Sequence, residues 1–506
     1  MSRVRTRSGR AARMQNQKSV QTRVAPVQRR MRPLDVLDQD AIERIHKASA
    51  AILEDVGIEF RDATAIEHWR AAGADVTDQR VRIDRALLME LVNKAPSEFK
   101  VQGRGASTGF MMGGDTSVFC TMKGAPFTRD LDGVRRSTTE ADVINFARLT
   151  QACPSFHMAG GFTCEPMDIP VAHRHLAMMR HHMVETELPL FGIGTSRERA
   201  EDCVAMSRIA AGDTMDKATS IFMHASGNSP LVWDEAMLDG ARVFADAGQA
   251  VLCSPFVLAA ANTPADIAAT IAQVNAEALA AIAYMQLYRP GTPVIYGQYT
   301  VSISMQSGAP MAGTPEVALI TTAIGQLARH YGVPWRTSAN HASSKSFDAQ
   351  SGYEGATTLM TAFNAGANLM LHSAGWDEGG LAICYGKFVA DDEQNQLMSR
   401  YAGGISLDRF DEALEAVRRI GPGGHYLGDS FTLDHFRSAF SMPEVMDFSS
   451  FEQWSAAGSH DMAARCRVKA KTMLEEFKPP YMDEAVREEL DAFVARRKEE
   501  IDPTFT

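Results

Sequence analysis

The stretch 314-TPEVALITTAIGQLARHYGVPWRTSAN-340 joins a helix pattern to a strand pattern. Thr314 is placed to cap the helix, Pro315 fits its first turn, and apolar residues then recur along one face as far as Tyr331. Gly332 ends the helix, and the run that follows opens like a buried strand. This stretch therefore predicts the second half of a β-α-β unit.

The same alternation recurs along most of the chain. Short apolar runs begin near residues 156, 188, 219, 250, 293, 334, 368 and 404, with helical patterns between them. Eight strands that alternate with helices favour an α/β fold of the closed (β/α)8 TIM barrel type over an open doubly wound sheet. No GxGxxG or Walker motif follows a predicted strand, which counts against a nucleotide-binding fold.

Composition divides the chain into four segments. Residues 1–34 contain ten Lys or Arg and no acid, although the whole chain carries a net charge of −11. We predict a basic, disordered segment at 1–34, an α+β segment packed on the barrel at 35–150, the barrel at 151–420 and a C-terminal helical extension at 421–506. The acidic body counts against a nucleic-acid partner.

Hydropathy and cysteine spacing limit the remaining classes of protein. The longest apolar stretches fall short of the roughly 20 residues that span a membrane, and no signal peptide is recognised, so we expect a cytoplasmic protein without a membrane partner. The seven cysteines are scattered and form no CxxC motif. We therefore expect no disulfide framework and no bound metal.

A polar run, 336-RTSANHASSKSFDAQSGYEG-355, follows the predicted strand at residue 334. Since active sites of (β/α)8 barrels form at the C-terminal ends of the strands, this run predicts a site. Arg336, His341 or Lys345 could bind a substrate carboxylate. Asp348 and Glu354 also fit the cap and first turn of the next helix, and a structural role is open for His341 as well.

Aromatic side chains are frequent near the predicted strand ends, and carboxylates are rare there. The candidates for a cage around a cation are Phe256, Tyr296, Tyr299 and Trp335. A quaternary ammonium is the ligand for which such a cage is most useful, because it has no hydrogen-bond donor. The same side chains could be ordinary core residues, and the sequence leaves both interpretations open.

Four segments together resemble one known family. They are 307-SGAPMAGTPEVALITTAIGQLARHYGVPWR-336, 343-SSKSFDAQSGYEG-355, 366-GANLMLHSAGWDEGGLAICYGKFVADDE-393 and 421-GPGGHYLGDSFTLDHFR-437. In this order they are similar to the trimethylamine methyltransferase family, the corrinoid-dependent amine methyltransferases, and the resemblance runs from about residue 35 to the C-terminus. It implies a (β/α)8 barrel that moves a methyl group from an amine to the Co(I) of a corrinoid on a separate small protein.

The chain shows no pyrrolysine, the active-site residue of that family's founding branch. It therefore resembles the branch that demethylates quaternary amines such as glycine betaine or proline betaine. A quaternary ammonium already carries its charge and leaves as a neutral amine, so no proton donor is needed and no catalytic acid or base is assigned. No corrinoid-binding DxHxxG motif occurs in the chain, so the cobalamin would come from a cognate corrinoid protein.

The resemblance also points to individual residues. The substrate-binding candidates in its most recognisable segments are His341, Lys345, Gln350, Tyr353, Glu354, His372 and Trp376. Asp377 and His425 are the candidates for the face that receives the corrinoid. We expect a homo-oligomer of this enzyme.

Three rival functions remain open on the sequence. They are a zinc-dependent corrinoid methyltransferase, a sensor that binds quaternary amines without methyl transfer, and a scaffold for a corrinoid protein. The scattered cysteines count against the zinc enzyme.

Overall fold

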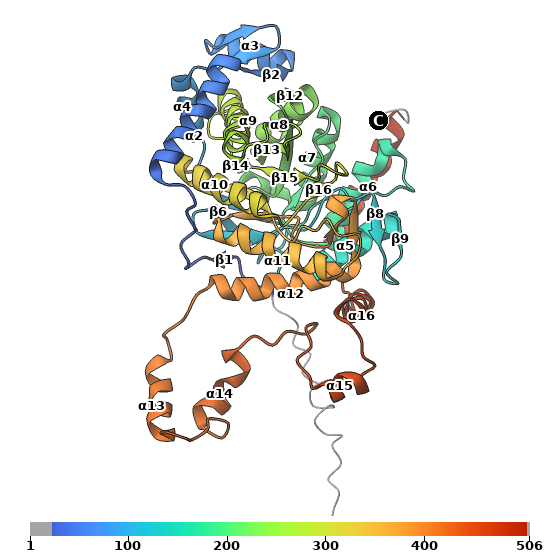
Figure 1. Ribbon diagram of the computed structural model, residues 1–506. Coiled ribbons are helices and arrows are strands. Elements are labelled where there is room, and N and C mark those ends of the chain that lie inside the picture. Colours follow the sequence, from blue (N-terminus) through green and yellow to red (C-terminus); the bar gives the residue numbers. More distant parts are fainter. Residues whose placement is uncertain (1–22, 503–506) are drawn as a thin grey trace, which may run out of the picture.

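A curled, largely parallel sheet forms the centre of the molecule in the computed structural model, which describes residues 23–502 (Figure 1). Its parallel strands, in spatial order, are β7 (Thr116–Phe119), β18 (Leu369–Leu371), β17 (Trp335–Ser338), β14 (Val294–Gly297), β13 (Ala250–Ala259), β11 (Ile221–Asn228) and β10 (Leu190–Phe191). Isolated parallel bridges join Cys120 to Met158 and Ala159 to Leu190, so residues 158–159 contact both ends of this order. The fold is mixed α/β.

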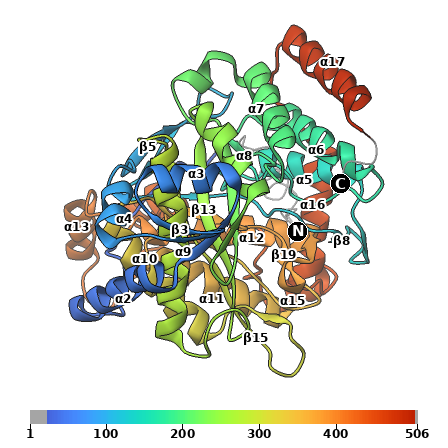
Figure 2. The same ribbon diagram turned by 90° about the horizontal axis from the view of Figure 1, so that it is seen from above.

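Helices surround this sheet (Figure 2). They are α5 (Glu140–Ala152), α6 (Val171–Glu185), α7 (Arg197–Ala211), α8 (Glu235–Asp246), α9 (Ile267–Tyr288), α10 (Pro315–Tyr331), α11 (Ala349–Asn364) and α12 (Tyr385–Ala402). Short 3-10 helices lie at Gly212–Asp216 and Glu378–Gly380. Because both faces of the sheet are covered, its strands are buried over almost their whole length.

Six of the eight predicted strands are present as β10, β11, β13, β14, β17 and β18. The run near 156 contributes only the isolated bridges, and the strand predicted near 404 is wrong. Ile405 in that run is 89% exposed, between α12 and α13 (Phe410–Ile420). Its place beside β18 is taken by β7, whose four residues are all buried. The boundary predicted at 150/151 therefore does not mark the edge of the sheet.

An N-terminal layer covers α9. It contains α2 (Gln39–Ala51), a π-helix (Ile52–Val56), α3 (Ala63–Ala71), α4 (Arg85–Val92), β2 (Ile58–Arg61), β3 (Asp75–Thr77) and β4 (Arg80–Arg82). β12 (Val232–Asp234) adds a strand to β2. A buried ion pair joins the layer to the body, since Arg242 lies 2.6 Å from Asp62.

The basic segment predicted as disordered over residues 1–34 is ordered from Arg23 onward. β1 (Val27–Gln28) pairs with β7, and the buried Arg29 donates to the Ser117 hydroxyl and to the carbonyl of Ala367. These contacts hold residues 23–34 against the body, so that part of the prediction is wrong. Residues 1–22 lie outside the described part of the chain.

α9 is long and apolar enough to cross a membrane, and within residues 23–502 it alone passes this test. It is also the core helix of the fold, with 83% of its most apolar window buried inside the structure. Its polar residues Asn275 and Glu277 are buried and hydrogen-bonded to neighbouring elements.

Smaller sheets lie outside the central one. One of them pairs β5 (Glu98–Val101) with β6 (Phe110–Gly113). The central sheet itself is extended next to β13 by β15 (Tyr299–Ile303), which pairs with β16 (Pro310–Met311). A further sheet contains β8 (Phe127–Arg129), β9 (Arg135–Ser137), β19 (Trp376–Asp377) and β20 (Ala382–Cys384).

The C-terminal part is helical, as predicted, but it begins before residue 421. After α13 come α14 (Ser430–Ala439), α15 (Phe451–Ala456), α16 (Met462–Glu475) and α17 (Glu484–Glu500). α17 is bound to the body by ion pairs of Arg497 with Asp202 and of Arg180 with Asp491. α13 and α14 instead project away from the body (Figure 1).

Candidate active site

Five aromatic rings meet where the strands of the central sheet end. Phe256 and Tyr299 stack with their centroids 5.2 Å apart, and Tyr299 lies 5.5 Å from His341. Trp376 lies 5.1 Å from His341 and 4.3 Å from His372. Four of the rings are buried, whereas Phe256 is 47% exposed. The group therefore forms an aromatic wall with one ring at the surface, and we call these five residues the ring cluster.

Arg336 lies beneath the ring cluster and is fully buried. It donates to the Gln298 carbonyl (2.6 Å), the Ser338 hydroxyl (2.8 Å) and Nδ1 of His372 (3.2 Å). Within residues 23–502 it forms no ion pair, and its Nε has no hydrogen-bond partner. Burial lowers the pKa of Arg336 to about 9, so it remains charged at neutral pH. A buried cation without an acid is suited to a ligand that carries the missing negative charge.

A second buried basic residue, Lys123, lies on the same inner wall. Its Nζ is 2.9 Å from Nδ1 of His224 and lies 4.5 Å and 4.4 Å from the ring centroids of Phe162 and Phe191. Burial, followed by the charge of Arg336, lowers the pKa of Lys123 well below its usual value. The sequence prediction missed Lys123 because it lies in the segment assigned to the N-terminal layer.

The two histidines of the ring cluster are neutral at physiological pH. Burial, with the positive charge of Arg336, lowers the pKa of His341 to about 3 and the pKa of His372 well below its usual value. They therefore act as uncharged ring surfaces, and Nδ1 of His372 accepts from Arg336. The two neutral rings therefore do not repel a cationic ligand as imidazolium rings would.

A narrow cleft adjoins the ring cluster on the side of α10 and α11. Tyr299, His341 and Ser338 form one wall. The remaining wall is rich in threonine and is lined by Thr300, Thr314, Thr321, Thr337, Thr357, Thr358 and Thr361.

The structure does not bring two of the predicted cage residues to the ring cluster. Tyr296 donates its hydroxyl to Asn275 on α9 (2.9 Å), and Trp335 donates its indole N–H to the Gly366 carbonyl (2.9 Å). Side chains alternate across a strand, so Arg336 points inward and Trp335 points toward the helices. Both rings are core residues of the helix layer.

Apart from His341, the predicted candidates on α11 and the loop before it lie outside the ring cluster. The Lys345 ammonium donates to the Ser343 carbonyl, and Gln350 donates to Glu354 on the helix surface. Tyr353 is 76% exposed. Asp348 caps α11 by accepting from the Ser351 N–H, so the structural interpretation of that residue is confirmed.

The two corrinoid-facing candidates are also placed elsewhere. Asp377 is fully buried and accepts from the Ser351 hydroxyl (2.9 Å). Burial raises the pKa of Asp377 to about 7, although Lys387 and that hydrogen bond act in the opposite direction. His425 is exposed between α13 and α14, on the part of the chain that projects from the body.

The raised pKa of Asp377 makes stability depend on pH. The folded state holds the proton up to about pH 7 and the unfolded state releases it near pH 3.8, so stability falls as pH rises between these values. We expect Asp377→Asn to remove this part of the pH dependence, which amounts to a few kcal/mol at most, at about 1.4 kcal/mol per pKa unit. Urea unfolding of both proteins at pH 5 and pH 8 checks this. Equal slopes against pH would contradict it.

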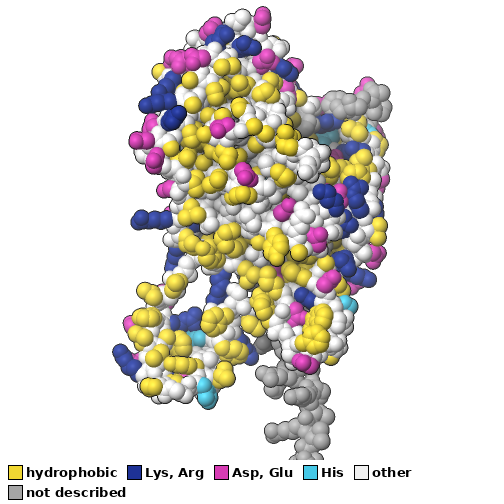
Figure 3. Space-filling model, viewed as in Figure 1, with side chains coloured by type: hydrophobic (Ala, Val, Ile, Leu, Met, Phe, Trp, Pro, Cys, Tyr) yellow, Lys and Arg dark blue, Asp and Glu magenta, His cyan; other side chains and the backbone are white. Residues whose placement is uncertain are grey.

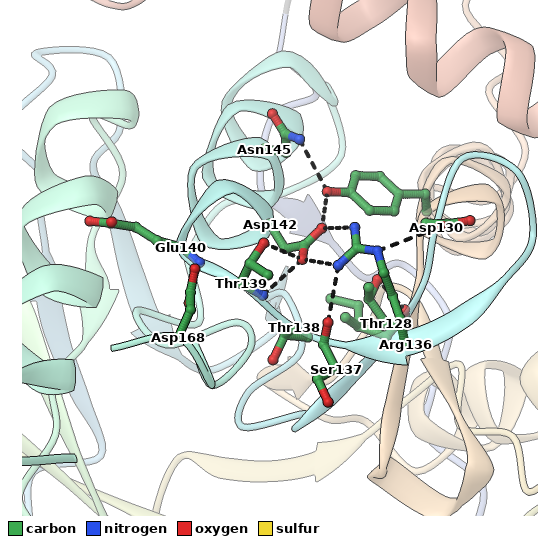
Figure 4. Close-up of polar contacts among 12 residues, drawn as sticks. Thr128, Asp130, Arg136, Ser137, Thr138, Thr139, Glu140, Asp142, Asn145 and Asp168 are labelled. Carbon is green, nitrogen blue, oxygen red and sulfur yellow. Dashed lines mark hydrogen bonds and ion pairs between the residues drawn. The ribbon is translucent and has the colours of Figure 1, made fainter. Parts of the chain in front are cut away.

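Polar contacts fix the hairpin of β8 and β9, which shares a sheet with the strand that carries Trp376 (Figure 4). Arg136 on β9 donates two hydrogen bonds to Asp142 on α5 (2.6 and 2.9 Å), and the Tyr385 hydroxyl donates a third (2.8 Å). Burial alone would raise the pKa of Asp142, but these partners outweigh it and hold that pKa below its usual value. The network attaches β8 and β9 to α5 and α12, and thereby fixes the sheet that carries Trp376.

Comparison with known proteins shows the family to which the chain belongs. Residues 3–502 match the model of the family described as trimethylamine methyltransferase (MTTB). A glycine betaine methyltransferase of Desulfitobacterium hafniense (strain Y51) is 37% identical, over 92% of this chain and 98% of the relative. A trimethylamine methyltransferase MttB of Desulfitobacterium hafniense (strain DSM 10664 / DCB-2) is 27% identical, over 90% and 92%.

Solved structures of a methylamine methyltransferase are similar in fold. The monomethylamine methyltransferase MtmB of Methanosarcina barkeri superposes with a TM-score of 0.52 at 12% identity and covers 88% of both chains. At that identity the likeness concerns the fold alone.

Proposed function

The chain belongs to the trimethylamine methyltransferase family, and on that premise we propose that it moves a methyl group from a carboxylated quaternary amine, with glycine betaine or proline betaine favoured, to a corrinoid on a separate protein. The observation that carries this proposal is the buried, acid-free Arg336 directly beneath the ring cluster. The 37% identical glycine betaine methyltransferase supports the same substrate class.

Each end of such a substrate has a partner in the site. A trimethylammonium group offers no hydrogen-bond donor and is attracted to ring faces, which Tyr299, His341 and Trp376 provide. Its carboxylate complements the guanidinium of Arg336, whose Nε is free to donate. The neutral cluster suits the reaction as well, because positive charge leaves the nitrogen in the transition state and a carboxylate-lined cage would oppose that change.

The chain itself contributes positioning and the exclusion of water. A reduced corrinoid would supply the electron pair for the new bond to the methyl carbon, and the carbon–nitrogen pair would stay on the departing tertiary amine. The half-exposed Phe256 marks the open side of the ring cluster, where a flat macrocycle can approach. With both substrate ends held, the methyl carbon is presented to that side.

Two features of the architecture belong to this proposal. We infer that the bridges at residues 158–159 complete a closed (β/α)8 barrel, which places the ring cluster at its C-terminal mouth. The corrinoid protein would dock at that mouth, on the rim formed by β8, β9 and β19.

A sensor that binds quaternary amines without methyl transfer is the main alternative, because it would use the same ring cluster and the same Arg336. A zinc-dependent corrinoid methyltransferase is the other, and a metal assay of the purified protein tests it. Within residues 23–502, no group of three or more His, Cys, Asp or Glu side chains is arranged to hold a metal ion.

Titration calorimetry tests the substrate class directly. We expect glycine betaine or proline betaine to bind, and choline and trimethylamine, which lack the carboxylate, to bind at least tenfold more weakly. Carnitine carries its carboxylate farther from the ammonium group, so its affinity tests the spacing between Arg336 and the ring cluster. Equal affinity for choline and glycine betaine would show that Arg336 does not bind the carboxylate. Absence of binding by all five compounds would overturn the proposal.

A further inference from the structure

The segment from Ile405 to Phe440, which we call the α13–α14 arm, has almost no core of its own. α14 contains no buried residue and α13 contains one, Ala416. Both helices project from the body and make their helix contact with each other (Figure 1). At 11 and 10 residues they are shorter than helices that persist alone in water. The arm therefore needs a covering surface to be stable.

Large apolar side chains are exposed along the arm. They include Leu407 (68% exposed), Phe410 (51%), Val417 (50%), Leu433 (56%), Phe436 (51%) and Phe440 (76%). Figure 3 shows hydrophobic side chains gathered over this part of the molecule. Exposed apolar patches of this kind mark surfaces that are covered by another protein.

On α13 the exposed apolar residues form one stripe. The exposed Phe410 and Val417 recur at helical spacing with the partly buried Leu414, on a side of the helix that does not include the buried Ala416. The charges of α13 are segregated as well: Asp411, Glu412 and Glu415 precede Arg418 and Arg419. A second α13 in antiparallel orientation would place the acidic half of each helix beside the basic half of the other.

We propose that the α13–α14 arm is the surface through which this chain pairs with a second copy of itself, with α13 packed against α13 of the other copy across a two-fold axis. The charge pattern is self-complementary only in that arrangement, which is the isologous contact of a symmetric dimer. A second copy is also present whenever the chain is made, so it can cover the apolar stripe at all times. The inference is independent of the proposed activity.

Light scattering coupled to size exclusion tests the pairing. We expect the intact protein to have at least twice the 55.2 kDa mass of one chain. Phe410→Glu combined with Val417→Glu should reduce the mass to that of one chain, and Leu319→Glu, a matched change at a 46% exposed position on α10, should leave it unchanged. A wild-type protein that runs as a single chain, or an arm variant with wild-type mass, would overturn the proposal.

A cysteine cross-link tests the geometry in a protein with an intact apolar stripe. All seven native cysteines are buried, so a cysteine added at a partly exposed position reacts alone. Because the middle of α13 meets its own copy, Leu414→Cys should give a covalent dimer on mild oxidation, whereas Tyr353→Cys, on the exposed face of α11, should not. Equal yields from the two variants, or no dimer from Leu414→Cys, would contradict the α13 pairing even if the double variant failed to fold.

Discussion

Replacing Arg336 with methionine lowers kcat/KM for glycine betaine by about 100- to 1,000-fold. The guanidinium is buried without an acid, so a substrate carboxylate bonded to it is stabilised strongly, and losing one partner of such a pair costs roughly 2–5 kcal/mol. At about 1.4 kcal/mol per factor of ten, such a loss spans roughly 30- to 4,000-fold, and the expected 100- to 1,000-fold lies in the middle of that interval. Steady-state kinetics with a reduced corrinoid acceptor measures it.

A second substrate, choline, serves as the control for Arg336→Met in place of a second variant. Any activity toward choline, which carries a hydroxyl in place of the carboxylate, should fall less than tenfold. The thermal midpoint should not fall either, because Arg336 is desolvated and forms no ion pair within the described residues. An equal loss with both substrates would show that Arg336 organises the site instead of binding the carboxylate.

Tyr299→Leu raises the dissociation constant for glycine betaine by about 30-fold. Tyr299 is the central ring of the cluster, within 6.2 Å of Phe256, His341, His372 and Trp376. A desolvated cation–π contact is worth roughly 2 kcal/mol, and leucine retains apolar volume without the ring face. Calorimetric titration of the folded variant measures the change.

Tyr296→Leu is the matched control for the ring cluster. Tyr296 is also a buried tyrosine of the central sheet, three residues away, but it points to α9 and bonds Asn275. We expect it to lower the thermal midpoint and leave the affinity within threefold of wild type. If both variants lost affinity equally, the ring cluster would not be the binding site.

Local sequence pattern was sufficient for most of the sheet and for part of the site. The helix from Pro315 to Tyr331 begins and ends as its cap residues indicate, and the strand after it delivers Arg336 to the interior. Aromatic residues near strand ends pointed to Phe256 and Tyr299. Tyr296 and Trp335 were assigned to the same group because a strand-end position alone does not say which face a side chain occupies.

What the sequence did not reveal depends on contacts between distant segments. β7 enters the sheet beside β18, about 250 residues later, and carries Lys123 to the inner wall just after its end. A four-residue strand in a Gly-rich region gives no periodic signal of its own. The exposure of Ile405 likewise follows from α12 ending at Ala402, not from any feature of the apolar run itself.

The most direct test of the account is a visible spectrum of reduced cobalamin, alone or on its cognate corrinoid protein, mixed with this protein and one methylated amine at a time. We expect methylated cobalamin to accumulate with glycine betaine or proline betaine, and not with trimethylamine. Binding of these betaines without any methylation would contradict methyl transfer and favour a sensor. Methylation from trimethylamine alone would contradict the carboxylated quaternary amine as substrate.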